Sequence, residues 1–282
     1  MRKGSIWSRL LVRNSQPHKI EELMGVEYQK RINKREDSKF VLVACMPKSG
    51  STFLSRTLAS ILGFGYKTLV SAFSQIEHDL YEPKLIDNYG KGMVVHMHTR
   101  GADANLELAR KYDMPVIVTT RNIADIVVSF HDHIHKETLK WPMAHLNEVQ
   151  LAQLSTSKQY DLIIDFLVPW LISFFVSWTD ATRIGGLPIK WIRYEELTLQ
   201  QNKTFENLQN WLPYEPATNV LPSLVEKDPK SVRLNRGISG RGKQLLSKPQ
   251  LDRIAHFATY YPGYDFSSIG LHPQDITHDS DD

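Results

Sequence analysis

The sequence contains only one cysteine, Cys45, so the 282-residue chain can form no internal disulfide bond. Chains that depend on disulfides belong to oxidising compartments, and this one is therefore expected to work in a reducing one. Cys45 follows directly on the apolar run 40–44. We expect it to be a small buried thiol rather than a reactive group.

The sequence also lacks an excess of charge, with 34 Lys and Arg against 31 Asp and Glu and a formal net charge of +3. A protein that follows a nucleic-acid backbone needs a larger basic excess gathered on one face. The composition therefore argues against a nucleic-acid partner, and any affinity for anions must come from local sites.

Long apolar runs are missing as well, since no segment reaches the roughly 18 consecutive apolar residues that cross a bilayer. The longest candidate, 166–178, contains Pro169 and two serines and is interpreted as a buried helix. The N-terminal segment 1–11 is basic, but Arg9 breaks its apolar part, which makes it a poor secretory signal. An unstructured or docked tail is preferred for this segment, with weak binding to a membrane surface as the alternative. We expect a soluble, cytoplasmic protein with no transmembrane segment.

No internal repeat or low-complexity tract divides the chain. Its length and its 41% of hydrophobic residues suit one large α/β domain with a sizeable core. Residues 1–38 form a charged lead-in, 39–272 form the single domain, and 273–282 form an acidic tail that is expected to be disordered. Apolar spacing predicts further strands at 66–70, 93–98, 115–120 and 189–193, and helices at 71–90, 102–113, 160–182, 194–212 and 249–261.

One polar loop lies between an apolar run, 40–44, and a stretch with helical apolar spacing, 53–62. A strand, a short loop and a helix in this order present backbone N–H groups to a phosphate at the helix N-terminus. The loop adds a mobile cation, a glycine that lets an anion approach the backbone closely, and three hydroxyl donors. These residues are Lys48, Gly50, Ser49, Ser51 and Thr52.

The loop differs from the phosphate loop of nucleotide triphosphatases, G-x-x-x-x-G-K-[ST], in which the lysine follows the second glycine. Here Lys48 precedes Gly50 by two residues, and no glycine opens the loop. A small-molecule kinase of the P-loop class is therefore kept only as an alternative.

A second candidate anion site follows the predicted strand 115–120, which leads directly into a helical pattern beginning at Arg121. Residues eight apart lie on nearly the same helix face, so Arg121 and Ser129 can converge on one oxyanion. An arginine that caps the helix beside a solvent-facing serine is the alternative interpretation.

The segment 47–53, Pro-Lys-Ser-Gly-Ser-Thr-Phe, resembles the 5′-phosphosulfate loop of sulfotransferases that use 3′-phosphoadenosine 5′-phosphosulfate (PAPS). The pattern Arg-Asn-x-x-Asp-x-x-x-Ser-x-x-x-His that begins at Arg121 is similar to the 3′-phosphate motif of the same family, and both motifs occur in the family's order. The resemblance implies a three-layer α/β sandwich, with a central parallel sheet flanked by helices as in P-loop nucleotide hydrolases. It also implies PAPS as co-substrate, adenosine 3′,5′-bisphosphate as product, and no metal.

Two more segments are similar to nucleotide-binding parts of that family. The segment 194–197 looks like its Tyr-Glu-Asp-Met/Leu segment, whose tyrosine lies near the adenine. The segment 236–240 looks like the part of its Arg-Lys-Gly-x-x-Gly segment that closes on the 3′-phosphate, but Asn235 replaces the first arginine, so Arg233 or Arg241 would have to substitute. The binding residues implied by the resemblance are Lys48, Ser49, Gly50, Ser51, Thr52, Phe53, Arg121, Ser129, Tyr194, Arg236 and Gly237.

The predicted strand 93–98 ends in two histidines. Its two-residue period places Val94, His96 and His98 on one face, at the strand end where ligands of open α/β sheets bind. The ordinary pKa of an imidazole, about 6.5, lets it accept a proton at neutral pH. The family's base is the histidine of a Lys-x-His segment, which the segment 96–98 resembles with His96 in the lysine position. We favour His98 as the base and Lys48 as the group that stabilises the leaving phosphate, and we keep His96 as the alternative base.

The acceptor side is less specific. His131 and His135 have the i, i+4 spacing of a metal-binding pair, but lining or covering an acceptor pocket is preferred for them. The polar stretch 136–160 is predicted to be irregular and to recognise the acceptor. The predicted activity is in-line sulfuryl transfer to a hydroxyl or amine of a small-molecule, lipid or carbohydrate acceptor. A non-catalytic nucleotide- or anion-binding module is the further alternative, and the oligomeric state is left open.

Overall fold

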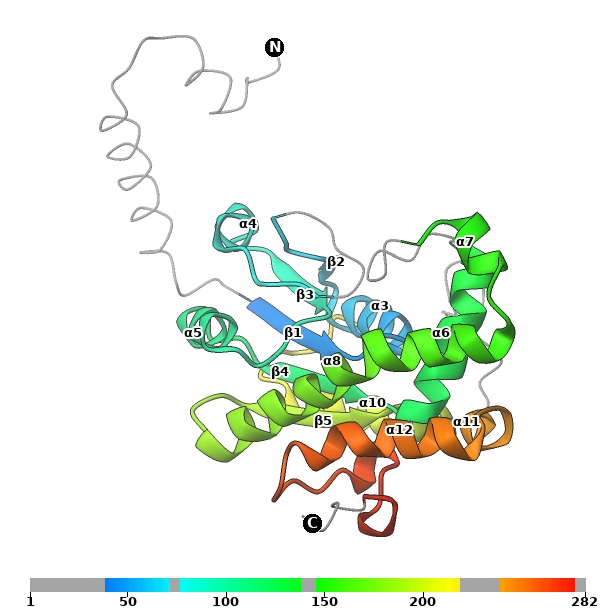
Figure 1. Cartoon of the computed structure of the whole chain (residues 1–282). Coiled ribbons are helices and arrows are strands. Elements are labelled where there is room, and N and C mark those ends of the chain that lie inside the picture. Colours follow the sequence, from blue (N-terminus) through cyan, green and yellow to red (C-terminus); the bar gives the residue numbers. More distant parts are fainter. Residues whose placement is uncertain (1–38, 72–76, 138–145, 219–238, 277–282) are drawn as a thin grey trace, which may run out of the picture.

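The computed structural model describes residues 39–71, 77–137, 146–218 and 239–276. Its centre is a sheet of five parallel strands in the order β2-β3-β1-β4-β5 (Figure 1). The strands are β1 (Lys39–Cys45), β2 (Gly65–Lys67), β3 (Gly92–Met97), β4 (Val116–Thr120) and β5 (Ile189–Arg193).

The middle strand, β1, is buried from its second residue onward and pairs with β3 on one side and β4 on the other. The chain leaves β1 toward β2 and later crosses from β3 to β4 on the opposite side. In open α/β sheets such a change of direction forms a ligand crevice at the carboxyl ends of the strands. The predicted α/β fold with a central parallel sheet is confirmed.

Helices cover both faces of the sheet (Figure 1). One face packs against α3 (Ser51–Leu62), α9 (Tyr194–Leu199) and α10 (Gln201–Trp211). The other packs against α5 (Asp103–Lys111), α6 (Ile123–Glu137), α8 (Thr156–Ile184) and α12 (Lys248–Thr259). The shorter helices are α4 (Glu82–Asp87), α7 (Glu148–Ala152), α11 (Arg241–Leu245), and the 3-10 helices η3 (Ser267–Ile269) and η4 (Pro273–Asp275).

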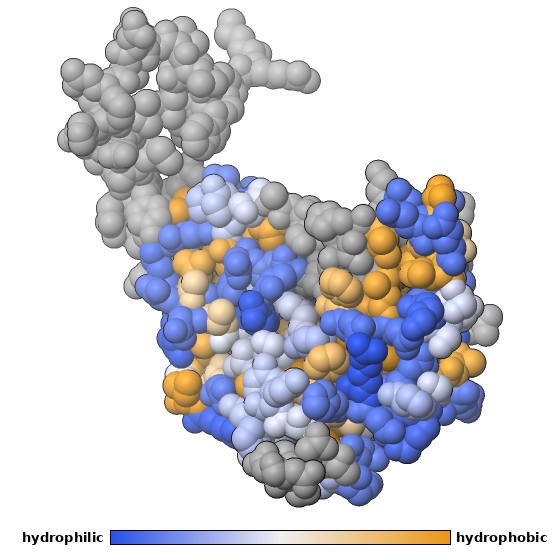
Figure 2. All heavy atoms as spheres, in the orientation of Figure 1, coloured by the Kyte–Doolittle hydropathy of each residue, from blue (hydrophilic) through white to orange (hydrophobic). Residues whose placement is uncertain are grey.

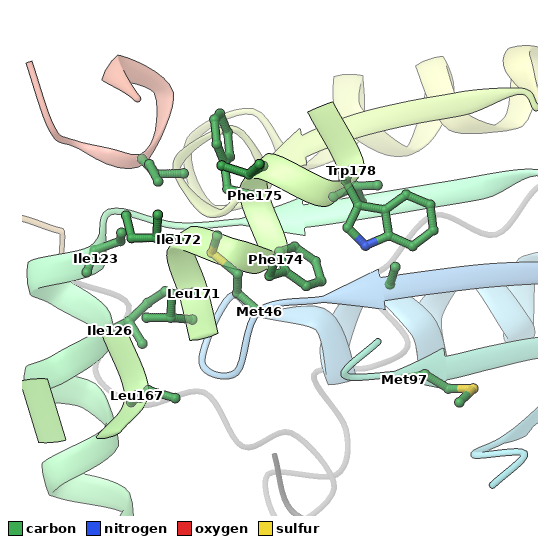
Figure 3. Close-up of a cluster of buried hydrophobic side chains, with 14 of the residues drawn as sticks. Met46, Met97, Ile123, Ile126, Leu167, Leu171, Ile172, Phe174, Phe175 and Trp178 are labelled. Carbon is green, nitrogen blue, oxygen red and sulfur yellow. The ribbon is translucent and has the colours of Figure 1, made fainter. Parts of the chain in front are cut away.

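Helix α8 is the long core helix of the second face. Figure 3 shows Leu171, Phe174 and Trp178 directed toward the sheet, near Met46, which follows β1. Each large apolar side chain buried in this way stabilises the fold by roughly 1.5–3 kcal/mol. The indole N–H of Trp178 also donates to the Thr99 carbonyl at 2.9 Å, so α8 fixes the chain just beyond β3.

The expectation that no segment is long enough to span a bilayer is wrong for α8. Its 29 residues include a stretch whose length and composition would allow it to cross a membrane, because the helix continues past both serines and through Pro169. Of that stretch, 56% is buried inside the protein. This burial makes α8 a core helix of the folded domain, and Figure 2 shows hydrophilic and hydrophobic residues mixed on the face that carries α8 and α12.

Several element boundaries differ from the sequence prediction. The second strand covers only 65–67 instead of 66–70, and within 71–90 the structure describes one short helix, α4, where a longer one was expected. The helix predicted for 194–212 is two helices, because Gln200 leaves helical geometry with φ −132° and ψ 43°.

The stretch 136–160 was predicted to be irregular, and its described residues are mostly helical. Helix α6 continues to Glu137, α7 begins after Asn147, and α8 starts at Thr156. The side chain of Asn147 and that of Gln150 cap α7 reciprocally, each accepting from the other's backbone N–H at 3.0 Å. Residues 138–145 lie outside the described part of the chain.

Candidate functional site

The loop between β1 and α3 is held in a fixed shape by buried hydrogen bonds. The backbone N–H of Met46 donates to the Thr119 carbonyl of β4 at 3.0 Å. The Ser49 hydroxyl donates to the Met46 carbonyl at 2.6 Å and pairs with the Thr119 hydroxyl at 2.8 Å. Ser49 therefore uses its hydroxyl to fasten the loop to the sheet, rather than presenting it to a ligand.

Helix α3 begins without a side-chain cap from the described residues. Gly50 occupies the N-cap position with φ 76°, and Lys48 also has a left-handed backbone, with φ 63°. The first backbone N–H groups of a helix have no intrahelical acceptor, so those of Ser51, Thr52 and Phe53 are a candidate anion site. The predicted order of strand, loop and helix is present, and phosphate binding at this loop stays a prediction.

Gly50 is closely approached by Tyr194 and Leu197 of α9, whose carbon atoms would lie 3.1 Å from an added Cβ. Gly50→Ala is expected to lower the free energy of unfolding by about 1–3 kcal/mol, since it combines a left-handed backbone with this contact. Chemical denaturation measures the loss. Gly90→Ala is the matched control, because Gly90 has φ 75° and open space around its Cβ position. Equal losses in the two variants would contradict a close fit at Gly50.

Arg121 connects the two candidate anion sites. Its Nη1 donates to the Lys48 carbonyl at 3.0 Å, and its guanidinium carbon lies 4.0 Å from the ring centroid of Tyr194. The side chain is only 5% exposed. Burial lowers the pKa of Arg121, while Tyr194 and Asp125 oppose that shift. The structure thus brings Lys48, Arg121 and Tyr194, which lie far apart in the sequence, into one place.

Ser129 is on α6 and is 2% exposed, so it does not face solvent. Between it and Arg121 lies Asp125, whose two carboxylate oxygens accept the backbone N–H groups of Gly240 and Gly242, each at 2.7 Å. This carboxylate fixes the start of α11, the described end of the glycine-rich basic segment, against α6.

The basic segment is described only from Ser239 onward. The predicted binding residues Arg236 and Gly237, and the possible substitute Arg233, lie outside the described residues. The other possible substitute, Arg241, begins a helix rather than continuing a loop, and its Nη1 lies 2.8 Å from an Asp132 carboxylate oxygen.

His96 of β3 and His98, which follows the end of β3, lie on the same side of the sheet as Cys45. The Cys45 sulfur is 3.3 Å from His96 Nε2 and 3.2 Å from His98 Nδ1. Cys45 is fully buried, and burial raises its pKa to about 12. It is a neutral thiol between the two imidazoles, as the sequence predicted for a buried small group.

His96 bonds to the protein through both ring nitrogens. Its Nε2 lies 2.9 Å from the Ser51 hydroxyl, and its Nδ1 lies 3.2 Å from the Tyr66 hydroxyl. Burial, together with the nearby His98, lowers the pKa of His96 to about 3. This neutral ring links β2, β3 and the first residue of α3.

His98 is arranged differently. Its Nδ1 lies 2.9 Å from the Cys45 carbonyl, which can only accept, so Nδ1 carries the proton and Nε2 carries the lone pair. Burial lowers the pKa of His98 to about 4, against a smaller opposite effect of that hydrogen bond, and the charge of Lys48 also lowers it. The side chains of Lys48 and His98 are therefore close enough to interact electrostatically.

Two further residues lie close to this site, the predicted Phe53 and the unpredicted His78. Phe53 packs edge-on against Phe205 of α10, with ring centroids 5.9 Å apart. His78, which is 4% exposed, contacts His98 and was missed by the sequence analysis. It lies in the stretch 77–81, which was assigned to the predicted helix 71–90 but is neither helix nor strand, so that prediction did not place it beside His98.

His131 and His135 bind the same atom, the side-chain oxygen of Gln159, at 2.8 and 2.7 Å. Gln159 in turn donates to the carbonyls of Leu151 and Leu154 at 3.0 Å. The pair thus fastens α6 to α7 and α8. Within the described part of the chain, no group of three or more His, Cys, Asp or Glu side chains is placed to hold a metal.

Solved structures share this fold. The chain matches mouse sulfotransferase SULT7A1 complexed with PAP at a TM-score of 0.60 and 15% identity, covering 82% of this chain and 87% of that one. It matches retinol dehydratase in complex with androsterone and inactive cofactor PAP at a TM-score of 0.51 and 11% identity, covering 83% and 84%. No protein-family model matches the sequence, and no curated protein is similar to it in sequence.

Proposed function

We propose that this chain, which has the fold of PAP-bound sulfotransferases, transfers a sulfuryl group from PAPS to an acceptor. The acceptor group is a hydroxyl or amine of a small molecule, lipid or carbohydrate. The observation that carries the proposal is the hydrogen bond between Arg121 Nη1 and the Lys48 carbonyl, at 3.0 Å. It supports the proposal because it joins the segment that resembles a 5′-phosphosulfate loop to the segment that resembles a 3′-phosphate motif, as binding of one doubly phosphorylated nucleotide requires.

The residues present fit such a nucleotide. The uncapped start of α3, with Gly50, Ser51 and Thr52, would hold the 5′ side. Arg121 and Ser129 would hold the 3′-phosphate, because a guanidinium and a hydroxyl are strong donors to phosphate oxygens. The close approach of Tyr194 to Gly50 leaves its ring beside the loop, and Tyr194 would lie near the adenine.

The transfer needs positioning and charge neutralisation rather than covalent chemistry from the protein. PAPS supplies the activated sulfuryl group. Lys48 neutralises the charge that develops on the departing phosphate. His98 Nε2 accepts the proton of the acceptor group, which makes that group a better nucleophile.

His98 is preferred to His96 as the base because of the hydrogen bonds that each makes. In His98 the Cys45 carbonyl keeps the proton on Nδ1 and leaves a lone pair on Nε2. In His96 both nitrogens are engaged, by Ser51 and Tyr66. His96 therefore orients the loop and the strand end, in the position where related motifs carry a lysine.

The rate of transfer is expected to stay nearly constant as the pH falls below the ordinary histidine pKa of about 6.5, and to decline only near the His98 pKa of about 4. The active form of the base is neutral, and a lowered pKa keeps it neutral at lower pH. The pKa values of His96 and His98 are lower in the folded chain than in the unfolded chain, so the unfolded chain binds protons first as the pH falls. The contribution of both residues to the free energy of unfolding is therefore complete above about pH 6.5 and decreases as the pH falls toward 4.

Initial rates taken directly after a pH jump separate these two effects, with circular dichroism as the check on folding. A half-maximal rate near pH 6.5 in folded protein would contradict the neutral, buried base.

The function is tested by two experiments. Calorimetry with adenosine 3′,5′-bisphosphate (PAP) and with ATP–Mg²⁺ separates a sulfotransferase from a P-loop kinase, since the proposal requires binding of the first and preference over the second. Incubation with PAPS and a native cell extract, followed by mass spectrometry, should then reveal products heavier by one SO₃ group. Binding of PAP without transfer to any of a broad acceptor panel would instead favour a non-catalytic binding module.

A further inference from the structure

We propose that His78 is a positioning residue for sulfuryl transfer, which holds His98 in the orientation that a base requires. The inference rests on the proposed function for its catalytic meaning. Its structural part, the control of the His98 imidazole by His78, can be measured without any transfer. Neither histidine pair in the predicted motifs includes His78, and it belongs to no anion-binding segment described above.

His78 and His98 form a reciprocal pair of hydrogen bonds, termed the clasp. The His78 backbone N–H donates to the His98 carbonyl at 2.7 Å, and the His98 backbone N–H donates to His78 Nδ1 at 3.0 Å. Their ring centroids are 5.3 Å apart. Strand β3 ends at Met97, so the clasp supplies backbone partners at the first position beyond the sheet.

The clasp defines the protonation of His78. A backbone N–H can only donate, so His78 Nδ1 accepts and its ring proton lies on Nε2. His78 therefore works as a neutral acceptor at a buried position. The His98 backbone is thus held by His78 and its ring by the Cys45 carbonyl, so both ends of the residue have a fixed partner.

The segment that carries His78 is anchored independently of His98. Asn105 of α5 accepts the Leu80 backbone N–H at 2.8 Å and donates to an Asp79 carboxylate oxygen at 2.9 Å. It also donates to the Arg100 carbonyl at 3.2 Å, on the chain that follows His98. A substitution at His78 therefore removes the acceptor of the clasp while Asn105 still holds both segments.

A pair of variants separates the acceptor from the bulk of the side chain. His78→Asn places an amide oxygen in the position of Nδ1 and keeps the acceptor. His78→Leu supplies an apolar side chain of similar size and removes the acceptor. Removing a residue that orients a metal ligand typically costs about 10–100-fold. By analogy, kcat should fall by about that factor in the leucine variant and stay within about threefold of wild type in the asparagine variant. Affinity for PAP, measured by calorimetry, should be equal in all three proteins.

The second readout is independent of transfer. Long-range proton–nitrogen spectra of histidine-labelled protein report which nitrogen of His98 carries the proton. Wild type and His78→Asn should show the Nδ1–H form, and His78→Leu should show a mixture. If wild type transfers no sulfate, the proposed function fails and the spectra alone decide the positioning role. Unchanged spectra and kcat in His78→Leu, or equal losses in both variants, would overturn the inference.

Discussion

Replacing His98 with alanine should lower the turnover number by about 10²–10⁴-fold, the usual contribution of a positioned general base. Binding of PAP should remain near the wild-type value, because His98 is not one of the residues proposed to bind the nucleotide around Lys48 and Arg121. Single-turnover rates with PAPS and an identified acceptor measure the chemical step, and calorimetry with PAP measures binding.

His96→Ala is the matched control, since it removes the other imidazole from the same strand face. It breaks the contacts with Ser51 and Tyr66, so a smaller loss is expected, with a weaker affinity for PAP. A near-normal turnover number in His98→Ala would show that His98 is not the base. A larger loss in His96→Ala than in His98→Ala would exchange the roles assigned to the two histidines.

The second large effect is expected at Arg121, where alanine should weaken PAP binding by about 10²-fold or more. Losing one partner of a buried, charge-assisted contact costs about 2–5 kcal/mol, and the Lys48 carbonyl loses its donor at the same time. Arg121→Lys should retain part of the affinity, because a lysine keeps the charge but not the planar fork.

Ser129→Ala serves as the smaller perturbation on the same helix. The loss of one hydroxyl donor should weaken binding only about 10-fold, the cost of a hydrogen bond to a charged group. PAP bound by Arg121→Ala as tightly as by wild type would show that the 3′-phosphate lies elsewhere.

The sheet and the two loops that carry the candidate anion sites could be predicted from the sequence because their signals are local. The apolar run before Cys45 and the β-branched run before Arg121 each fill one strand that is buried on both faces. Each strand is followed by a polar turn and a helical apolar period. Such patterns depend on neighbouring residues and survive whatever the rest of the chain does.

The contacts inside the site could not be predicted, because they join residues that are distant in the sequence. The Ser49 hydroxyl appeared to be a ligand donor but bonds to Thr119, 70 residues away. His131 and His135 had metal-like spacing but converge on Gln159. His78 lies in the predicted helix 71–90 but in no helix of the structure, and its hydrogen bond to His98 joins residues 20 apart in the sequence.

The central claim is that the sites near Lys48 and Arg121 bind opposite ends of one nucleotide. Calorimetric affinities of the wild-type protein for adenosine 3′,5′-bisphosphate, adenosine 3′-monophosphate and adenosine 5′-monophosphate test it most directly. The account expects the bisphosphate to bind at least about 10-fold more tightly than either monophosphate, because each phosphate adds charge-assisted hydrogen bonds. A monophosphate that binds as tightly as the bisphosphate would contradict it.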